Sequence, residues 1–284
     1  MTLDLAQRAR AHLQARDVAL PLGARTLLMG ILNVTPDSFS DGGRYADPAA
    51  ALAHGRALVA EGADILDIGG ESTRPGGTDV DADEELARVV PVLPGLVAAV
   101  PVPVSIDTYK ARVAEAALQA GARIVNDVWG LQRDPDIARV AAAHGAAVVV
   151  MHNRRDLDPA ADMLAEVKAF LARSVEIALA AGIGEDQIVV DPGVGFGKTL
   201  EQDLVLIARL GELRAMGFPV LLGASRKKFL GRLLDGAAPL ERVNGTLGAH
   251  LMGIAAGADI IRAHDIAAHR DALRVADAIR VHAP

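Results

Sequence analysis

The chain has 284 residues, a length that fits either one large α/β barrel or two ordinary domains. It contains no cysteine, which excludes structural disulfides and cysteine-based zinc sites and favours a reduced, cytoplasmic environment. Its net charge of −7 argues against non-specific binding to nucleic acid, and the lack of a long uncharged apolar run predicts no membrane span.

The first 25 residues are expected to form an N-terminal extension that precedes the main domain. Residues 2–16 have the spacing of a short amphipathic helix, with Leu3, Leu5 and Leu13 among polar side chains. Residues 20–23 indicate a turn or hairpin before the first clear strand. Charged residues are spread through the extension and it has no apolar run, so we expect no secretion signal in it.

One pattern recurs over residues 26–284: a short apolar run ends in polar or glycine residues, and a helical stretch follows. Eight strands are predicted, at Leu27–Leu32, Ile65–Ile68, Val102–Ile106, Arg123–Val125, Ala147–Met151, Ile188–Val190, Val220–Leu222 and Ile260–Ile261. Eight helices are predicted, at about 48–61, 84–98, 110–120, 135–144, 160–181, 201–216, 240–256 and 266–281. The regular repeat favours one domain over two unrelated ones.

The predicted strands show no alternation of apolar and polar residues, so both faces of the sheet are expected to lie buried beneath helices. Right-handed crossovers between sequential parallel strands close most simply into a (β/α)8 TIM barrel. A doubly wound open sheet shares the βα repeat and is the alternative fold. Asp47–Pro48 and Asp134–Pro135 indicate helix starts. Six glycines indicate helix ends: Gly62, Gly121, Gly145, Gly182, Gly217 and Gly257.

Catalytic and binding residues of a TIM barrel lie at the carboxyl ends of its strands. Polar side chains of functional types follow all eight predicted strands. They are Asn33, Thr35, Asp37 and Ser38; Glu71, Ser72, Thr73 and Arg74; Asp107; Asn126 and Asp127; His152 and Asn153; Asp191; Ser225, Arg226, Lys227 and Lys228; and Arg262, His264 and Asp265. Their convergence on one face favours a functional site.

Several of these residues also have a purely structural interpretation. Ordinary turns can account for Asp37 and Asp41, and helix capping can account for Asp127 and Asp265. Asp67, one residue before the end of the second strand, can be a hydrogen-bonded acid inside the barrel. Structural hydrogen bonds or solvent exposure can account for the others: His152, Arg226 and Lys228.

Two kinds of chemistry are indicated at the strand ends. Asp107, Asn126 and Asp191 can hydrogen-bond a flat ring with alternating donors and acceptors, and Lys227 can join them. Paired carboxylates can also stabilise a ring that becomes cationic, since a unit charge about 4 Å away contributes roughly 4 kcal/mol at an effective dielectric constant of 20. The second kind is anion binding, for which arginine and histidine suit a diphosphate. Its candidates are Arg74, Arg262 and His264.

The stretch Asp191–Thr199 is similar to a nucleotide phosphate loop, because three glycines precede Lys-Thr. Its spacing does not fit, since the position that needs the first glycine holds Pro192. We therefore expect Lys198 to bind no nucleotide phosphate. The glycines are expected to let the backbone close over the ring that Asp191 binds, with Phe196 placed to cover that ring.

Seven motifs make the sequence resemble the dihydropteroate synthase family. They are LMGILNVTPDSFSDGG at Leu28–Gly43, GESTRPG at Gly70–Gly76, SIDTYK at Ser105–Lys110, VND at Val125–Asp127, the stretch Asp191–Lys198, SRK at Ser225–Lys227 and RAHD at Arg262–Asp265. They occur in order from about Thr26 to Asp265, and the first is long and highly specific. The resemblance implies a TIM barrel, usually a homodimer, that joins 6-hydroxymethyl-7,8-dihydropterin diphosphate to 4-aminobenzoate in folate biosynthesis.

The same resemblance implies roles for individual residues. The pterin would be bound by Asp107, Asn126, Met151, Asp191, Phe196, Gly223 and Lys227, with Asp107, Asp191 and Lys227 as catalytic residues. The diphosphate would be bound by Asn33, Arg74, Arg262 and His264, and Asn33 would also be a ligand of Mg²⁺. Aminobenzoate and sulfonamides would contact Phe39, Thr73, Pro75 and Ser225.

The resemblance also implies a dissociative reaction, in which Mg²⁺-assisted departure of diphosphate precedes attack by the aminobenzoate amine. Two alternatives stay open. A methyltetrahydrofolate-binding methyltransferase shares the barrel and the pterin pocket, but it needs neither a diphosphate site nor the Thr73–Pro75 loop. A non-catalytic paralogue would bind a pterin or a partner protein and make no product. Trp129 departs from the family pattern, in which a small polar residue commonly follows VND, and the position of Lys228 varies in the family.

Overall fold

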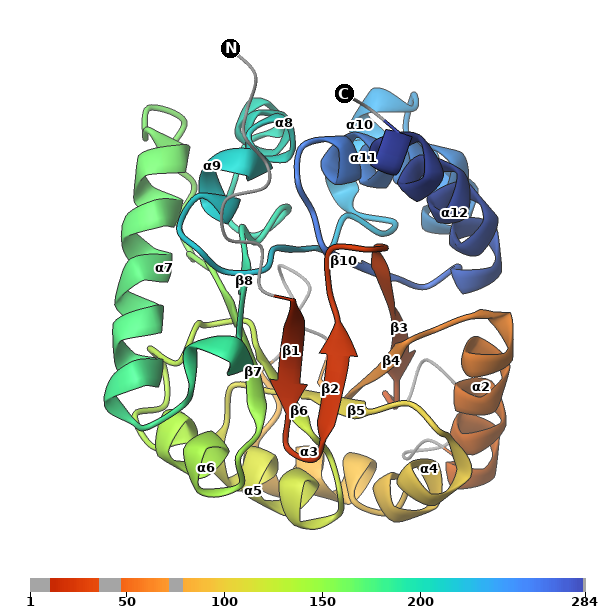
Figure 1. Ribbon diagram of the computed structural model, residues 1–284, viewed down its shortest axis with the longest axis vertical. Helices are drawn as coiled ribbons and strands as arrows, with labels where there is room; N and C mark the ends of the chain where they lie inside the picture. The colour runs from red at the N-terminus through yellow and green to blue at the C-terminus, as the bar shows by residue number, and fades with distance from the viewer. Residues whose placement is uncertain (1–10, 36–46, 72–78, 283–284) are drawn as a thin grey trace.

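The computed structural model of the protein describes residues 11–35, 47–71 and 79–282. Eight parallel strands in these ranges form one sheet, and helices encircle it (Figure 1). The strands are β3 (Leu27–Asn33), β4 (Ile65–Gly69), β5 (Val104–Asp107), β6 (Ile124–Asp127), β7 (Ala147–Met151), β8 (Ile188–Asp191), β9 (Leu221–Leu222) and β10 (Ile260–Ala263).

The pairing order closes this sheet into a barrel. Strands β3 to β8 pair in chain order, β10 pairs with β3, and β9 pairs with β10. The seam between β8 and β9 is joined by a parallel bridge between Val190 and Val220. A 2.9 Å hydrogen bond from Val190 N to the Pro219 carbonyl oxygen lies beside that bridge. The predicted (β/α)8 barrel is therefore confirmed, and the open doubly wound sheet is wrong.

The helices cover the outside of the barrel. They are α2 (Pro48–Glu61), α3 (Ala82–Val89), α4 (Leu93–Ala99), α5 (Ala111–Gln119), α6 (Ile137–Ala143), α7 (Met163–Ala180), α8 (Leu200–Ala208), α9 (Leu210–Arg214), α10 (Lys228–Leu233), α11 (Val243–Ala255) and α12 (Ile266–His282), with 3-10 turns η1 (Glu185–Gln187) and η2 (Pro239–Arg242). The predicted helix 84–98 is divided between α3 and α4, because Pro91 lacks the amide hydrogen that a continuous helix needs. The predicted helix 201–216 is likewise divided, at Arg209.

The helix ends follow the predicted signals with one exception. Asp47 caps α2 by accepting a 2.9 Å hydrogen bond from Ala49 N, and Gly62 ends it at a left-handed φ of 116°. The predicted cap at Asp134 is wrong, because α6 begins at Ile137. The Asp134 carboxylate accepts hydrogen bonds from Asp136 N, at 3.1 Å in the turn before α6, and from Ala111 N, at 2.8 Å.

Strand side chains divide between two apolar layers. Leu28 and Leu66 point outward and pack with the helices. Met29 and Ile65 belong to a separate inner cluster that fills the barrel. Both layers are apolar, which explains why the strands show no alternation in sequence and still have two distinct faces.

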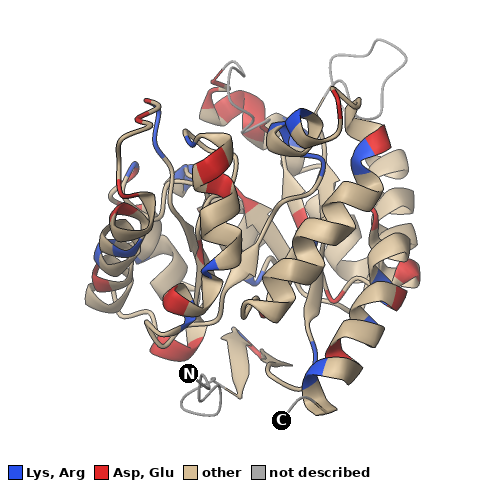
Figure 2. Ribbon diagram, turned by 90° about the horizontal axis from the view of Figure 1, so that it is seen from above, with Lys and Arg blue, Asp and Glu red and all other residues tan. Residues whose placement is uncertain are grey.

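The N-terminal extension closes one end of the barrel with a hairpin. β1 (His12–Ala15) and β2 (Val18–Pro21) pair antiparallel, with Arg16 at a left-handed φ of 55° between them. Fully buried Leu13 joins the inner cluster of the barrel. Figure 2, turned by 90°, shows the hairpin beneath one end of the barrel. The helix predicted over residues 2–16 is therefore wrong for 12–15, and residues 2–10 lie outside the described ranges.

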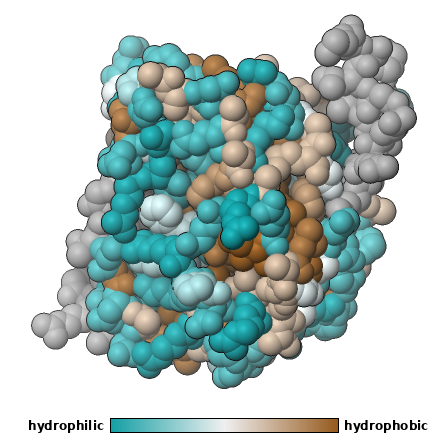
Figure 3. Space-filling view, turned by 90° about the vertical axis from the view of Figure 1, so that its left-hand side faces the viewer, coloured by the Kyte–Doolittle hydropathy of each residue, from teal (hydrophilic) through white to brown (hydrophobic). Residues whose placement is uncertain are grey.

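The outer surface is largely polar where Figure 3 shows it. This view faces the side of the molecule on which α7 lies, and hydrophilic side chains cover most of it around a smaller apolar area. Such a surface is expected of helices whose apolar side packs on a sheet. Among the described helices, none is long and apolar enough to cross a membrane.

Candidate active site

The site lies at the mouth of the barrel, which is the edge formed by the carboxyl ends of the strands. Asp107 ends β5 and is in register with Asn126 of β6. Asp191 ends β8 and is in register with Met151, the last residue of β7. Parallel strands thus bring these four predicted residues to one edge, although they are far apart in sequence.

An acid–guanidinium cluster occupies this mouth. Arg262, on β10, donates from Nε to Asp67 Oδ2 at 2.6 Å and from Nη2 to Asp107 Oδ2 at 2.7 Å. Asn126 Nδ2 donates to the same oxygen of Asp67 at 3.0 Å. Two carboxylate oxygens, Asp67 Oδ1 and Asp107 Oδ1, are buried and have no hydrogen-bond partner in the described structure. Such unpaired acceptors are costly unless a ligand supplies donors.

Burial sets the protonation of this cluster. It raises the pKa of Asp107 to about 8 against the opposing charge of Arg262, and the neighbouring Asp67 adds to the rise. One guanidinium cannot neutralise two buried carboxylates, so Asp107 keeps its proton to a higher pH than an exposed aspartate does. The sequence indicated Asp67 only as a possible structural acid. An acid within an otherwise apolar strand was the signal for its central place.

A second group of residues faces Asp191. Burial raises the pKa of Asp191, while the charge of Lys227 lowers it. The pKa of Lys227 is itself lowered by burial to about 8, and Asp191 opposes that change. Lys227 donates to the Val194 carbonyl oxygen, and its ammonium lies 4.5 Å from the centre of the Phe196 ring. A charged residue, an aromatic ring and a buried acid therefore converge here.

An apolar wall adjoins these polar groups. Met151 clusters with Tyr109 and Val128, and Phe196 packs against that cluster. Gly223 lies nearby, since a Cβ there would be 3.8 Å from Arg262 Cβ and 3.9 Å from Lys227 Nζ. The arrangement offers an apolar surface with hydrogen-bonding groups at its edge, as a flat heteroaromatic ligand requires.

The remaining predicted residues are placed around this centre or fall outside the described ranges. Ser225 and His264 contact each other, with 2.9 Å between Ser225 Oγ and His264 Nδ1. Asn33 ends β3 and is half-buried. Four residues with predicted binding roles lie outside the described ranges: Phe39, Thr73, Arg74 and Pro75. So do three further strand-end candidates: Asp37, Ser38 and Ser72.

The glycines after Asp191 allow a close approach within the protein's own chain. Gly193, Gly195 and Gly197 all have left-handed φ values, of 66°, 83° and 60°. A Cβ at Gly193 would overlap the carbonyl oxygen of His152, and one at Gly195 would lie 2.9 Å from Lys227 Cδ. The approach of this loop to a bound ring stays a prediction.

Structural roles are found for several other strand-end residues. Asp127 accepts hydrogen bonds from Trp129 N at 2.7 Å and Leu131 N at 2.8 Å, so it holds the loop after β6. Arg226 and Asp265 form an ion pair. These interactions hold loops at the mouth of the barrel. Asp127 therefore has a structural role in a turn, where helix capping was the structural alternative considered.

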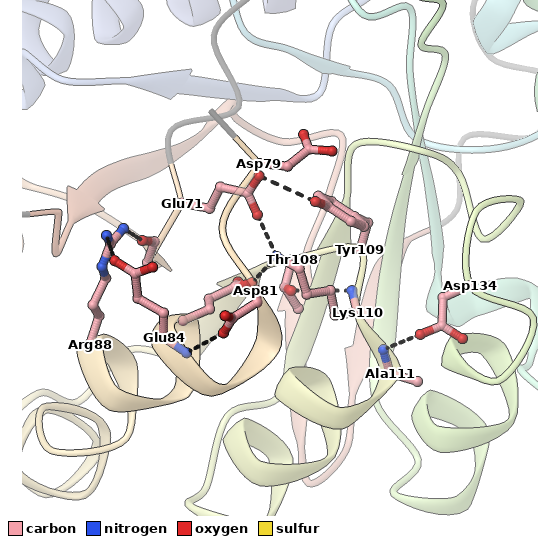
Figure 4. A network of polar contacts seen from close by, with 12 residues as sticks. Glu71, Asp79, Asp81, Glu84, Arg88, Thr108, Tyr109, Lys110, Ala111 and Asp134 are labelled. Carbon is pink, nitrogen blue, oxygen red and sulfur yellow. Dashed lines mark hydrogen bonds and ion pairs between the residues drawn. The ribbon is translucent and has the colours of Figure 1, made fainter. Parts of the chain in front are cut away.

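A network of polar contacts lies at the end of β4 and is shown in Figure 4. Glu71 accepts hydrogen bonds from Tyr109 Oη, at 3.2 Å, and from the Lys110 ammonium. Lys110 also donates to Glu85, whose pKa is raised by burial. Figure 4 shows Glu71, Tyr109 and Lys110 pointing toward one another from two neighbouring strand ends. The GESTRPG and SIDTYK motifs are therefore in direct contact.

Residues 29–264 match the family of pterin-binding enzymes. Dihydropteroate synthase of Bacillus subtilis is 49% identical over 248 residues, which cover 87% of this chain and 86% of that protein. The Mycobacterium leprae dihydropteroate synthase is 49% identical over 263 residues and is covered to 92%. The chain belongs to the dihydropteroate synthase family.

Solved structures of the dihydropteroate synthase family have the same fold. The Xanthomonas albilineans enzyme with 4-aminobenzoic acid superposes with a TM-score of 0.91 at 44% identity, covering 97% of this chain and 100% of that chain. The Clostridium difficile enzyme in the presence of pteroic acid gives a TM-score of 0.88 at 48% identity, covering 91% and 98%. A further Xanthomonas albilineans structure is a complex with 7,8-dihydropteroate.

Proposed function

We propose that the protein joins 6-hydroxymethyl-7,8-dihydropterin diphosphate to 4-aminobenzoate, giving 7,8-dihydropteroate and diphosphate. The observation that carries this proposal is the cluster of Asp67, Asp107, Asn126 and Arg262, with two buried carboxylate oxygens that lack donors. The proposal is supported by relatives named dihydropteroate synthase and by solved relatives that contain 4-aminobenzoic acid or 7,8-dihydropteroate.

The unpaired oxygens define how the pterin binds. The ring presents several N–H donors along one edge, and Asp67 Oδ1 and Asp107 Oδ1 are buried acceptors without partners. Met151 and Phe196 supply apolar surface for the ring faces. A donor-bearing ring would therefore satisfy the acids and cover the apolar wall in one step, whereas water would satisfy only the acids.

The diphosphate would be bound by Asn33, Arg74, Arg262 and His264. In the described structure Arg262 is paired with the two acids, so the bound diphosphate would share this guanidinium with them. Its remaining N–H groups can reach a phosphate oxygen because one guanidinium carries five donors.

Mg²⁺ fits this site through Asn33. The amide oxygen of Asn33 is a hard donor of the kind that Mg²⁺ prefers, and Mg²⁺ commonly takes one or two protein ligands together with substrate phosphates. When bound, Mg²⁺ would supply charge neutralisation of the diphosphate.

The reaction would be a substitution at the methylene carbon attached to the pterin. The bond from this carbon to the diphosphate oxygen breaks, and both electrons leave with the diphosphate, which Arg262 and His264 stabilise. The resulting pterin cation is stabilised by the carboxylates of Asp107 and Asp191. The neutral amine of 4-aminobenzoate then forms the new C–N bond and loses a proton. Ser225, with Phe39, Thr73 and Pro75, would bind the aminobenzoate or a sulfonamide.

A homodimer is proposed from the surface of α11 and α12. Met252 on α11 is 64% exposed, and Val275 and Ile279 on α12 are 61% and 66% exposed. Exposed apolar side chains gathered on neighbouring helices are typical of a protein interface. We also propose a cytoplasmic location, which the lack of cysteine supports.

The proposal is tested with purified protein, pterin diphosphate, 4-aminobenzoate and Mg²⁺. Formation of dihydropteroate together with an equal amount of diphosphate is expected. Methyl transfer from methyltetrahydrofolate to an acceptor, without diphosphate release, would instead identify the methyltransferase alternative. Tight pterin binding without product would identify a non-catalytic paralogue, and either result would overturn the proposal.

A further inference from the structure

Lys198, the lysine of the phosphate-loop-like stretch, has a role that the proposed reaction does not use. Its side chain is turned into the protein and only 8% of the residue is exposed. Nζ lies 2.9 Å from His152 Nδ1, 2.8 Å from the Gly193 carbonyl oxygen and 3.0 Å from the Phe196 carbonyl oxygen. An ammonium carries three donors, so these three acceptors complete its hydrogen bonding.

The histidine among these acceptors is held in one form. In its charged form Lys198 has no lone pair, so His152 Nδ1 accepts and the ring proton is on Nε2. Burial lowers the pKa of Lys198 to about 7, so most of the lysine is in this charged form at pH 6.5. Nε2 is 3.5 Å from the Glu166 carboxylate on α7. Burial lowers the pKa of His152 to about 3, with Lys198 adding to the effect. The neutral ring of His152, which directly follows β7, therefore lies between Lys198 and Glu166 of α7.

The segment that binds Lys198 also contacts two residues of the candidate site, Asp191 and Lys227. Gly193 N donates to Asp191 Oδ1 at 2.7 Å, and the Val194 carbonyl oxygen accepts from Lys227. Phe196 N donates to the Gly193 carbonyl oxygen at 3.1 Å. The segment 193–196 thus wraps around the ammonium on one side and orders the pterin-binding groups on the other.

The hydrogen bonds from Lys198 stabilise one conformation of this segment. Three left-handed glycines within five residues give an unfolded chain many alternatives, so ordering the segment is costly in entropy. Two of its carbonyl oxygens point at a single buried nitrogen, which a solvent-exposed loop would not require. A central cation that satisfies several carbonyls at once selects one conformation from the many.

We propose that Lys198 is a positioning residue that sets the conformation of segment 193–196, and through it the placement of Asp191, Phe196 and Lys227 for the pterin. This inference rests on the proposed function for the identity of the ligand. The conformation of the segment can be measured without any ligand, so the two proposals can fail separately.

The test replaces Lys198 and observes Phe196 directly. Protein is labelled with 4-fluorophenylalanine and studied by ¹⁹F NMR at pH 6.5, where five phenylalanines give few resonances. Phe196→Leu assigns the resonance of interest. Lys198→Met removes the ammonium at similar length, and Lys198→Arg keeps the charge but cannot direct three N–H groups from one nitrogen. Lys168→Met, on α7, is the matched control. Binding is measured with 6-hydroxymethylpterin as the probe.

In Lys198→Met we expect a broadened or split Phe196 resonance and pterin binding at least tenfold weaker than in the unaltered protein. The other fluorine resonances and those of Lys168→Met should stay sharp. A single sharp Phe196 resonance with pterin affinity within twofold of the unaltered protein would overturn the inference. If Lys198→Met does not fold, the same two readouts in Lys198→Arg decide the matter. Failure of the unaltered protein to bind pterin would overturn the proposed function, and the resonance of Phe196 would still test the positioning role.

Discussion

Arg262 Nη2 donates a 2.7 Å hydrogen bond to Asp107 Oδ2, although the two residues are 155 positions apart in the chain. The same guanidinium also binds Asp67, so one positive charge serves two buried acids. The arrangement leaves an excess of negative charge at the barrel mouth, which burial turns into a raised pKa of about 8 for Asp107. A ligand that is cationic, or becomes so, would remove this excess.

Replacing Arg262 is expected to destabilise the protein in a pH-dependent way. Arg262→Met leaves Asp67 and Asp107 buried without a cation, and breaking such a pair costs about 3 kcal/mol of unfolding free energy. The pKa of Asp107, already raised by burial, rises further without the cation, so the folded state binds more protons than the unfolded state between about pH 4 and pH 8. Stability then falls as pH rises.

Urea unfolding of this variant at pH 5.5 and pH 8.5 measures the effect. The loss relative to the unaltered protein should be larger at pH 8.5, where the unpaired carboxylates must be charged. Arg139→Met, which removes an exposed arginine from α6, should cost less than about 0.5 kcal/mol at either pH. A loss in Arg262→Met that is equal at both pH values would show that charge is not its cause.

Asp107→Asn and Asp191→Asn are expected to lower turnover about 100-fold each, the usual scale for removing one group that stabilises a transition-state charge. Affinity for the pterin diphosphate should fall less, because an amide keeps one acceptor and the size of the side chain. Steady-state kinetics and equilibrium binding of the same variants separate the two effects. Asp136→Asn, an exposed change just before α6, controls for loss of one charge. Near-normal turnover in both site variants would contradict the cation-stabilising role.

Much of the barrel is predictable from sequence because each strand is a short apolar run bounded by polar or glycine residues. The mouth is predictable for the same reason, since parallel strands bring Asp107, Asn126 and Asp191 to one edge wherever the barrel closes. The hairpin is not predictable in this way. Its strands are only four residues long. Its turn places Arg16 in a left-handed conformation, which neighbouring residues do not predict.

The sequence also does not predict which side chains of the site form ion pairs and hydrogen bonds with one another. Asp67 lies within β4 and Asp107 ends β5, and nothing in their neighbours shows that they share Arg262. The spacing around Lys198 predicts that it binds no nucleotide phosphate, but the sequence does not show its three acceptors, which are brought together only when the loop folds. These contacts depend on where each side chain points in the folded protein, which the order of residues in the sequence does not show.

The hairpin at the closed end of the barrel is expected to contribute stability without affecting chemistry. Leu13 is fully buried in the inner cluster, so Leu13→Ala should lower the unfolding free energy by about 3–5 kcal/mol through lost transfer energy and an unfilled cavity. Turnover at 25 °C should stay within about twofold, because the hairpin lies at the end away from the mouth. Leu157→Ala, at a side chain that is 58% exposed, is the control. A large loss of turnover in folded Leu13→Ala would link the hairpin to the site.

The apolar surface of α11 and α12 predicts the oligomeric state. If it forms a homodimer interface, the unaltered protein should have about twice the chain mass of 29.5 kDa by light scattering. Ile279→Asp, at a side chain that is 66% exposed, should yield a folded monomer, because a carboxylate buried against a second copy would lack a partner. Leu157→Asp, in the loop before α7, controls for adding an acid to an exposed leucine. If the unaltered protein is a monomer, the proposed interface does not exist. If the dimer persists in Ile279→Asp, the interface lies elsewhere. Dissociation of Ile279→Asp alone would assign the interface to α12.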